Sequence, residues 1–139
     1  YLTTGPEILA DSVGHVDVLV AGVGSGSSIT GTGRFLKENI PGFKVMAVEP
    51  AESPVLSGGQ AGQHGIQGIG ANFVPAILDR GLLDEIIQVP TAEAMTTARR
   101  LMRLQGVCAG ISTGANVLAA LSVAARPEMR GKNIVTFAC

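Results

Sequence analysis

The chain has 139 residues, enough for one domain with a buried core, and its formal net charge at pH 7 is −1. This near-neutral balance excludes the basic surface that binding to nucleic acid or to an anionic membrane requires, and no run of about 18 apolar residues is present to cross a bilayer. Cys108 and Cys139 form no C-x-x-C motif, and His15 and His64 have no partners at ligand spacing, so the sequence indicates neither a disulfide framework nor a metal site.

Apolar runs and helical patterns alternate along the chain, which predicts an α/β fold. The first apolar run is almost unbroken, as is typical of a strand buried on both faces. In the helix that Thr91 caps and Gly106 ends, apolar residues recur on one side. The predicted strands are residues 16–23, 44–48, 85–89, 107–111 and 133–137, and the predicted helices are residues 6–13, 28–39, 91–105 and 113–125. This order predicts a doubly wound, mostly parallel sheet with helices on both faces.

The connection between the first strand and the second helix is a run of small residues, Gly24-Ser25-Gly26-Ser27-Ser28. A strand that turns through glycines into a helix leaves free backbone N–H groups at the positive end of the helix dipole, which suits a phosphate group. Glycine allows close approach of the backbone to an anion, and the serine hydroxyls add donors. An ordinary turn between strand and helix also uses glycine, but it needs fewer small residues and fewer hydroxyls. We therefore expect these residues to bind phosphate.

Three phosphate-binding templates compete for this loop. The nucleoside-triphosphate loop G-x-x-x-x-G-K-[ST] fits the glycines at positions 26 and 31, but Thr32 stands where the lysine belongs, so we reject it. The dinucleotide fingerprint G-x-G-x-x-G begins at Gly22, has Ser27 in place of its third glycine, and has Glu49 near the position of a ribose partner. This template, which implies an NAD-binding dehydrogenase domain, is the runner-up. A single phosphate monoester is the third possibility, and it needs no ribose partner.

A second loop with hydroxyl groups, residues 110–114, follows the strand predicted at 107–111. Ligands of parallel sheets bind at the carboxyl ends of the strands, so this loop and the serine loop are expected to share one site. The alternative is that Ser112 or Thr113 only caps the next helix. The residues alone leave both interpretations open.

Several segments together resemble cysteine synthase (O-acetylserine sulfhydrylase) in their order and spacing. They are residues 3–8 (TTGPEI), the serine loop with residues 30–38 (TGTGRFLKE), residues 48–50 (VEP), 57–59 (SGG), 66–71 (IQGIGA) and 110–115 (GISTGA). The resemblance extends over nearly the whole chain. It implies a fold of the tryptophan synthase β-subunit type and pyridoxal 5′-phosphate (PLP) as the cofactor.

The resemblance assigns roles to individual residues. It implies that Gly24, Ser25, Gly26, Ser27 and Ser28 hold the cofactor phosphate and that Ser112 faces the pyridine nitrogen of the cofactor. The family's loop reads Gly-Thr-Gly-Gly-Thr, so Ser27 departs from it at a position where glycine can adopt a conformation costly for serine. Residues 67–73 match a segment at the entrance of the family's active site, where we expect a mobile rim.

The implied reaction replaces the acetoxy group of O-acetyl-L-serine with sulfide and gives L-cysteine and acetate. Within the family, β-cyanoalanine synthase is the nearest rival. The resemblance also implies a homodimer, and serine acetyltransferase as a protein partner whose tail enters the active-site cleft. A non-catalytic module that binds serine acetyltransferase is therefore a further alternative.

PLP chemistry requires a lysine for the Schiff base, and Lys37, Lys44 and Lys132 all lie in solvent-facing or wrong-edge contexts. The resemblance places the family's lysine in an N-terminal half outside this chain. We therefore expect residues 1–139 to form a single partial domain with no catalytic residue of its own and no activity alone. Because no signal peptide opens the sequence, we expect a soluble protein of the cytoplasm, with an organellar stroma or matrix as the alternative.

Overall fold

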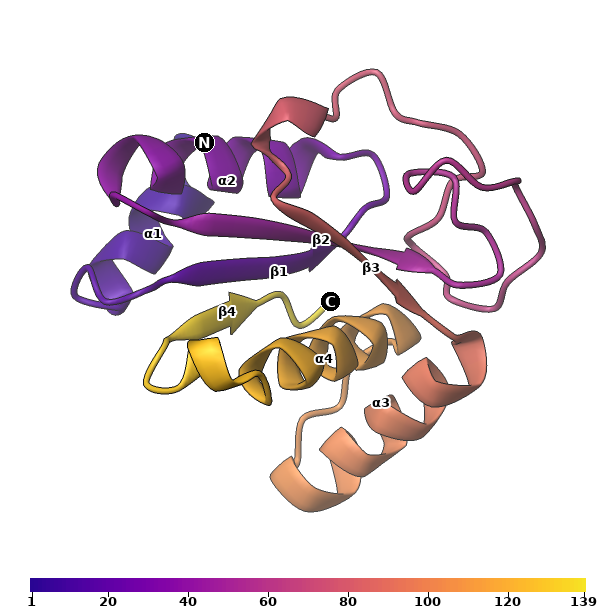
Figure 1. Ribbon diagram of the computed structural model, residues 1–139. Helices are drawn as coiled ribbons and strands as arrows, with labels where there is room; N and C mark the ends of the chain where they lie inside the picture. The colour runs from indigo at the N-terminus through magenta and orange to yellow at the C-terminus, as the bar shows by residue number, and fades with distance from the viewer.

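Four parallel strands form a sheet between two layers of helices in the computed structural model, which describes residues 1–139 (Figure 1). The strand order is β3-β2-β1-β4, so β1 lies in the interior of the sheet. The strands are β1 (Val18–Gly22), β2 (Lys44–Pro50), β3 (Glu85–Val89) and β4 (Ile134–Thr136). The helices are α1 (Thr4–Asp11), α2 (Ser27–Asn39), α3 (Thr91–Gln105) and α4 (Ile111–Ala124), with short 3₁₀ turns at Arg80–Leu82 and Pro127–Met129.

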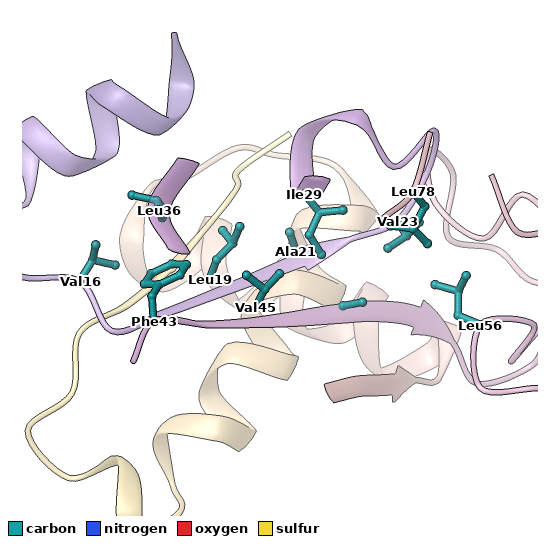
Figure 2. Packing of buried hydrophobic residues seen from close by; sticks show 11 residues of the cluster. Val16, Leu19, Ala21, Val23, Ile29, Leu36, Phe43, Val45, Leu56 and Leu78 are labelled. Carbon is teal, nitrogen blue, oxygen red and sulfur yellow. The ribbon is translucent and has the colours of Figure 1, made fainter. Parts of the chain in front are cut away.

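The two faces of the sheet carry separate hydrophobic cores, because successive side chains of a strand point to opposite faces. On one face, Leu19 and Val45 pack with Ile29 and Leu36 of α2, as Figure 2 shows. On the other face, Val18 and Val20 of β1 and Met46 and Val48 of β2 form the second core. They pack with residues of α3 and α4, namely Ala94, Ala115, Ala119 and Val123. Helices therefore cover both faces, and the predicted doubly wound architecture is confirmed.

The strand predicted at residues 107–111 does not exist. Gly106 ends α3 in a left-handed conformation, with φ 69°, and the chain then runs directly into α4 at Ile111. Val107 and Cys108 are exposed, and the N–H of Gly110 donates to the C=O of Cys139 rather than to a strand. The run instead links α3 to α4, which pack on each other.

The predicted bounds of α3, residues 91–105, are confirmed, but its predicted cap is wrong. Pro90 precedes the helix as its N-cap, and Thr91 is already helical. The Thr91 hydroxyl accepts a hydrogen bond from the N–H of Gly65 at 3.0 Å, so it anchors the long connection between β2 and β3 and does not cap its own helix. That connection has no helix or strand before residue 80 and extends past the carboxyl ends of the strands (Figure 1). None of the helices combines the length and the apolar character that crossing a bilayer requires.

Helices α3 and α4 cross closely at Gly114, which predicts that a larger side chain there lowers stability. A Cβ atom added at Gly114 would lie 2.1 Å from the C=O oxygen of Ala94 and 2.8 Å from the backbone nitrogen of Ala98. We expect Gly114→Ala in the full-length protein to lower the free energy of unfolding by about 1–3 kcal/mol, because the helices must separate. Urea unfolding measures this loss.

The control is Ser122→Ala, at an exposed position on the same helix, which should change the free energy of unfolding by less than about 0.5 kcal/mol. Equal stability of the two variants would contradict the close crossing.

Candidate functional site

The loop after β1 leaves a group of backbone donors without partners. The N–H groups of Gly24, Ser25, Gly26, Ser28 and Ile29 form no hydrogen bond within the chain. They lie just before and within the first turn of α2, where the helix dipole is positive. An anion bound there would satisfy several of them at once, so the loop has the donor set of a phosphate site.

Gly26 has the conformation that this loop requires. It is the residue before α2, its φ is 84°, and no side chain caps the helix. A Cβ atom added to it would lie 2.8 Å from Cβ of Leu78. Both the backbone conformation and the close contact therefore favour glycine at this position.

Ser27 fits the loop without backbone strain. It is the first residue of α2 and is not among the residues with positive φ, so the loop does not need glycine there. Its hydroxyl lies 2.9 Å from that of Ser25, and both side chains are exposed. Ser27 is the only one of the predicted phosphate-loop residues that does not line the adjoining cavity.

One cavity of about 390 Å³ brings the other predicted site residues together. Gly24, Ser25, Gly26, Ser28 and Ser112 all contribute to its lining. The rest of the wall comes from Thr4, from the end of β1, from Ile29, from residues 68–69, from α4 and from residues 137–139. The two hydroxyl-bearing loops therefore share one site, as their place at the carboxyl edge of the sheet predicts.

The Ser112 hydroxyl is free, and the alternative that it caps α4 is wrong. Gly110 is the N-cap, without a side-chain hydrogen bond, and the Ser112 hydroxyl forms no hydrogen bond within the chain. Thr113 does not cap the helix either, because its hydroxyl donates to the C=O of Cys139 at 2.8 Å and accepts from the N–H of Cys139 at 2.7 Å. Ser112 is left with a donor that faces the cavity.

No acidic or basic side chain lines this cavity. The lysines lie elsewhere: Lys37 pairs with Asp84 and Lys132 with Asp17, each at 2.8 Å, and Lys44 is exposed at the amino end of β2. The hydrogen bond from Lys132 lowers the pKa of Asp17 below its ordinary value, at the opposite edge of the sheet. The positive potential of the cavity thus comes from backbone dipoles at the N-termini of α2 and α4.

Glu49 is not a ribose partner. Its side chain is 2% exposed and its carboxylate accepts hydrogen bonds from the N–H of Leu56 at 2.7 Å, from the N–H of Ser57 at 3.1 Å, and from the Ser57 hydroxyl. It is fully occupied in holding the loop after β2 and does not line the cavity. Glu49 therefore does not supply the acidic residue that the dinucleotide-binding template requires.

The segment expected to be a rim is bonded to the phosphate loop. The N–H of Gly70 donates to the C=O of Val23 at 3.0 Å, and a Cβ atom on Gly24 would lie 2.3 Å from the C=O oxygen of Gly68. The ring of His64 accepts from the N–H of Ile66 at 3.2 Å and bonds the C=O of Gly70 at 2.7 Å. The sequence interpretation missed this role of His64, and a lone histidine gives no pattern that would have revealed it.

Asn116 is the second residue that the sequence interpretation missed. It is buried, lines the cavity, and lies one helical turn after Ser112. That spacing of four residues on a helix, which places both side chains on the same face, is the signal that could have found it.

No group of three or more His, Cys, Asp or Glu side chains is arranged to hold a metal ion.

Comparisons with known proteins agree on one family. The sequence model of the family described as "Pyridoxal-phosphate dependent enzyme" matches residues 1–139. The chain is 51% identical to cysteine synthase 3 of Caenorhabditis elegans over 136 residues, which cover 98% of this chain and 40% of that protein. It is 48% identical to cysteine synthase A of Escherichia coli (strain K12), with coverage of 96% and 44%.

Comparison with a solved structure indicates the same family. The O-acetylserine sulfhydrylase isoform 3 of Entamoeba histolytica superposes with a TM-score of 0.96 at 45% sequence identity. The match covers 97% of this chain and 40% of that one. The chain thus spans less than half the length of the proteins that it matches.

The geometry at Gly26 predicts the effect of a bulky side chain. We expect Gly26→Val in the full-length protein to weaken the binding of PLP about tenfold, because the valine side chain must displace Leu78 or shift the loop donors. Titration of the cofactor-free protein with PLP, followed by absorbance, measures the affinity.

The matched control is Gly58→Val. Gly58 has a similar φ of 87°, but a Cβ atom there meets nothing within 4 Å, and the residue does not line the cavity. This variant should keep the affinity of the unaltered protein. Unchanged affinity in Gly26→Val would remove the phosphate assignment from the loop.

Proposed function

Since the chain belongs to the family of pyridoxal-phosphate dependent enzymes, we propose that the protein that carries it is a cysteine synthase. The reaction proposed is the replacement of the acetoxy group of O-acetyl-L-serine by sulfide, which gives L-cysteine and acetate. The relatives with 44–51% identity over nearly the whole chain support it. The observation that carries the proposal is one cavity that joins a loop of unpartnered N–H groups to the free hydroxyl of Ser112.

The residues present fit PLP. The N–H groups of Gly24, Ser25, Gly26 and Ser28 and the dipole of α2 would hold its phosphate, and Ser27 would add a hydroxyl at the outer side of the loop. No aspartate or glutamate side chain lines the cavity. When bound, the cofactor supplies an electron-withdrawing ring that facilitates loss of the substrate's β-substituent.

Ser112 would contact the pyridine nitrogen of the cofactor. A hydroxyl can donate a hydrogen bond to a neutral nitrogen and carries no charge that would keep that nitrogen protonated. An aspartate at this position would favour the protonated ring and so a stronger electron sink. The neutral residue therefore suits an elimination and replacement reaction that needs only modest withdrawal of electrons.

The catalytic lysine is proposed to lie outside residues 1–139. None of the lysines of the chain lines the cavity, and the ion pairs of Lys37 and Lys132 hold those side chains elsewhere. The residues described here would thus bind and orient the cofactor, and the covalent link to the enzyme would come from another part of the protein.

We also propose that the protein is a cytoplasmic homodimer to which serine acetyltransferase binds. The resemblance to cysteine synthases supports these assignments. We propose small molecules as the substrates and a protein as the partner, with no binding to nucleic acid or to a membrane. The net charge of −1 is consistent with these assignments.

Substitutions at Ser112 test its proposed contact with the ring nitrogen. We expect Ser112→Asp to shift the absorption spectrum of the bound cofactor and to change the turnover of O-acetyl-L-serine, since a carboxylate raises the proton affinity of the ring nitrogen. Ser112→Ala should alter both properties less. Because the Ser112 hydroxyl has no partner in the chain, neither a helix cap nor a buried hydrogen bond is lost.

The free energy of unfolding of Ser112→Ala should therefore stay within about 0.5 kcal/mol of the unaltered protein. Identical spectra and rates for the two Ser112 variants would argue against contact with the ring.

Borohydride reduction locates the lysine. The full-length protein is loaded with PLP, reduced, digested and examined by mass spectrometry for a pyridoxyl-lysine. We expect stoichiometric labelling at a lysine outside residues 1–139 and only scattered labelling of Lys37, Lys44 and Lys132. The chain of 139 residues by itself should not turn over O-acetyl-L-serine.

Stoichiometric labelling of one of these lysines, together with turnover by the isolated chain, would overturn the assignment of the lysine to another part of the protein.

A further inference from the structure

The ladder of hydrogen bonds between β1 and β4 ends before the carboxyl end of β1. Its first rung joins the N–H of Val18 to the C=O of Asn133 at 3.2 Å. In a parallel ladder the same pattern recurs every second residue on each strand. Four residues further along both strands, the N–H of Gly22 would therefore donate to the C=O of Phe137. That hydrogen bond is not made.

The side-chain amide of Asn116 occupies the place of this missing rung. Its Oδ1 accepts from the N–H of Gly22 at 2.8 Å, and its Nδ2 donates to the C=O of Phe137 at 3.0 Å. These two partners also fix which end of the amide carries the oxygen. Asn116 thus inserts one amide group between two backbone groups that would otherwise pair with each other.

The separation of the strands coincides with the site. Residue pairing between β1 and β4 ends at Val20 and Thr136, and the Thr136 hydroxyl donates to the C=O of Val20 at 2.6 Å. Beyond this point Gly22, Asn116 and Phe137 all line the cavity described above. The cavity therefore opens where the amide of Asn116 parts the two strands.

We propose that Asn116 is a positioning residue for the cofactor, an inference that rests on the proposed function. By holding β1 and β4 apart it sets the width of the cavity at the carboxyl edge of the sheet. It also links α4, one turn after Ser112, to the residue two positions before Gly24. The phosphate loop and the hydroxyl that faces the ring are thereby kept at a constant separation.

The chemistry of the contact calls for a carboxamide. Asn116 is 2% exposed, and the two backbone groups that it bonds would lose these partners if its side chain were removed. An aspartate keeps the acceptor for Gly22 but has no N–H for Phe137, and its charge would lie against a carbonyl oxygen. An alanine has neither group and leaves the strands free to close into the direct rung.

The test compares Asn116→Ala and Asn116→Asp with Val123→Ala in the full-length protein. Val123 is fully buried in the second half of α4 and does not line the cavity, so its truncation lowers stability without touching the site. For each variant, urea unfolding of the cofactor-free protein gives the stability, and titration with PLP gives the affinity and the absorption maximum of the bound cofactor.

We expect both Asn116 variants to bind PLP about tenfold more weakly and to shift the absorption maximum, while Val123→Ala keeps the affinity within about twofold and the maximum unchanged. Unchanged affinity and spectrum in Asn116→Ala, or equal losses of affinity in all three variants, would overturn the proposal. In the latter case the effect would follow from stability alone.

Failure of the proposed function gives a different result. If the unaltered protein does not take up PLP at all, the proposed function is wrong, and inorganic phosphate becomes the probe for Asn116. Calorimetric titration with phosphate should then show weaker binding in both Asn116 variants than in Val123→Ala. Equal phosphate affinities would overturn the role of Asn116.

Discussion

The end of β1 is the constraint on which the rest of the site depends. This strand is buried on both faces and has a neighbour on each side, so its direction and its last residue are strongly determined. Two parts of the cavity wall, α4 and the segment with residues 68–69, are bonded to that end. The N–H of Gly22 bonds Asn116 of α4, and the C=O of Val23 accepts from Gly70 of the long connection. The unpartnered donors follow within the next residues of the chain.

The proposed phosphate site contains no charged side chain. Its potential comes from N–H groups at helix N-termini, whose positions are fixed by the backbone and need no flexible lysine or arginine. The hydroxyl of Ser112, proposed to contact the ring nitrogen, is uncharged as well. In the proposed function, such a cavity would hold the cofactor phosphate through backbone donors and would leave the electronic state of the ring to neutral hydrogen bonds, which suits mild electron withdrawal.

Local patterns predicted most of the fold, and the errors have a common cause. The strand at Glu85–Val89 is exactly as expected, and β1 and α2 begin or end within two residues of their predicted bounds, because buried strands and amphipathic helices leave strong periodicity. The apolar run at 107–111 looked like a buried strand. It lies between two helices that pack directly on each other through Gly114, a contact between distant residues that leaves no periodic pattern.

The sequence by itself determined the parallel sheet and the resemblance to cysteine synthase, and it predicted the phosphate loop, because these depend on residues that are contiguous or evenly spaced. Tertiary structure alone decided what the isolated polar residues do. Glu49 lies at the carboxyl end of β2, where a ribose partner is expected, yet its carboxylate accepts hydrogen bonds from the backbone at 56–57. Asn116 reads as one polar residue in an apolar helix, yet it bridges Gly22 and Phe137. Both roles depend on hydrogen-bond partners that only the folded backbone brings within reach.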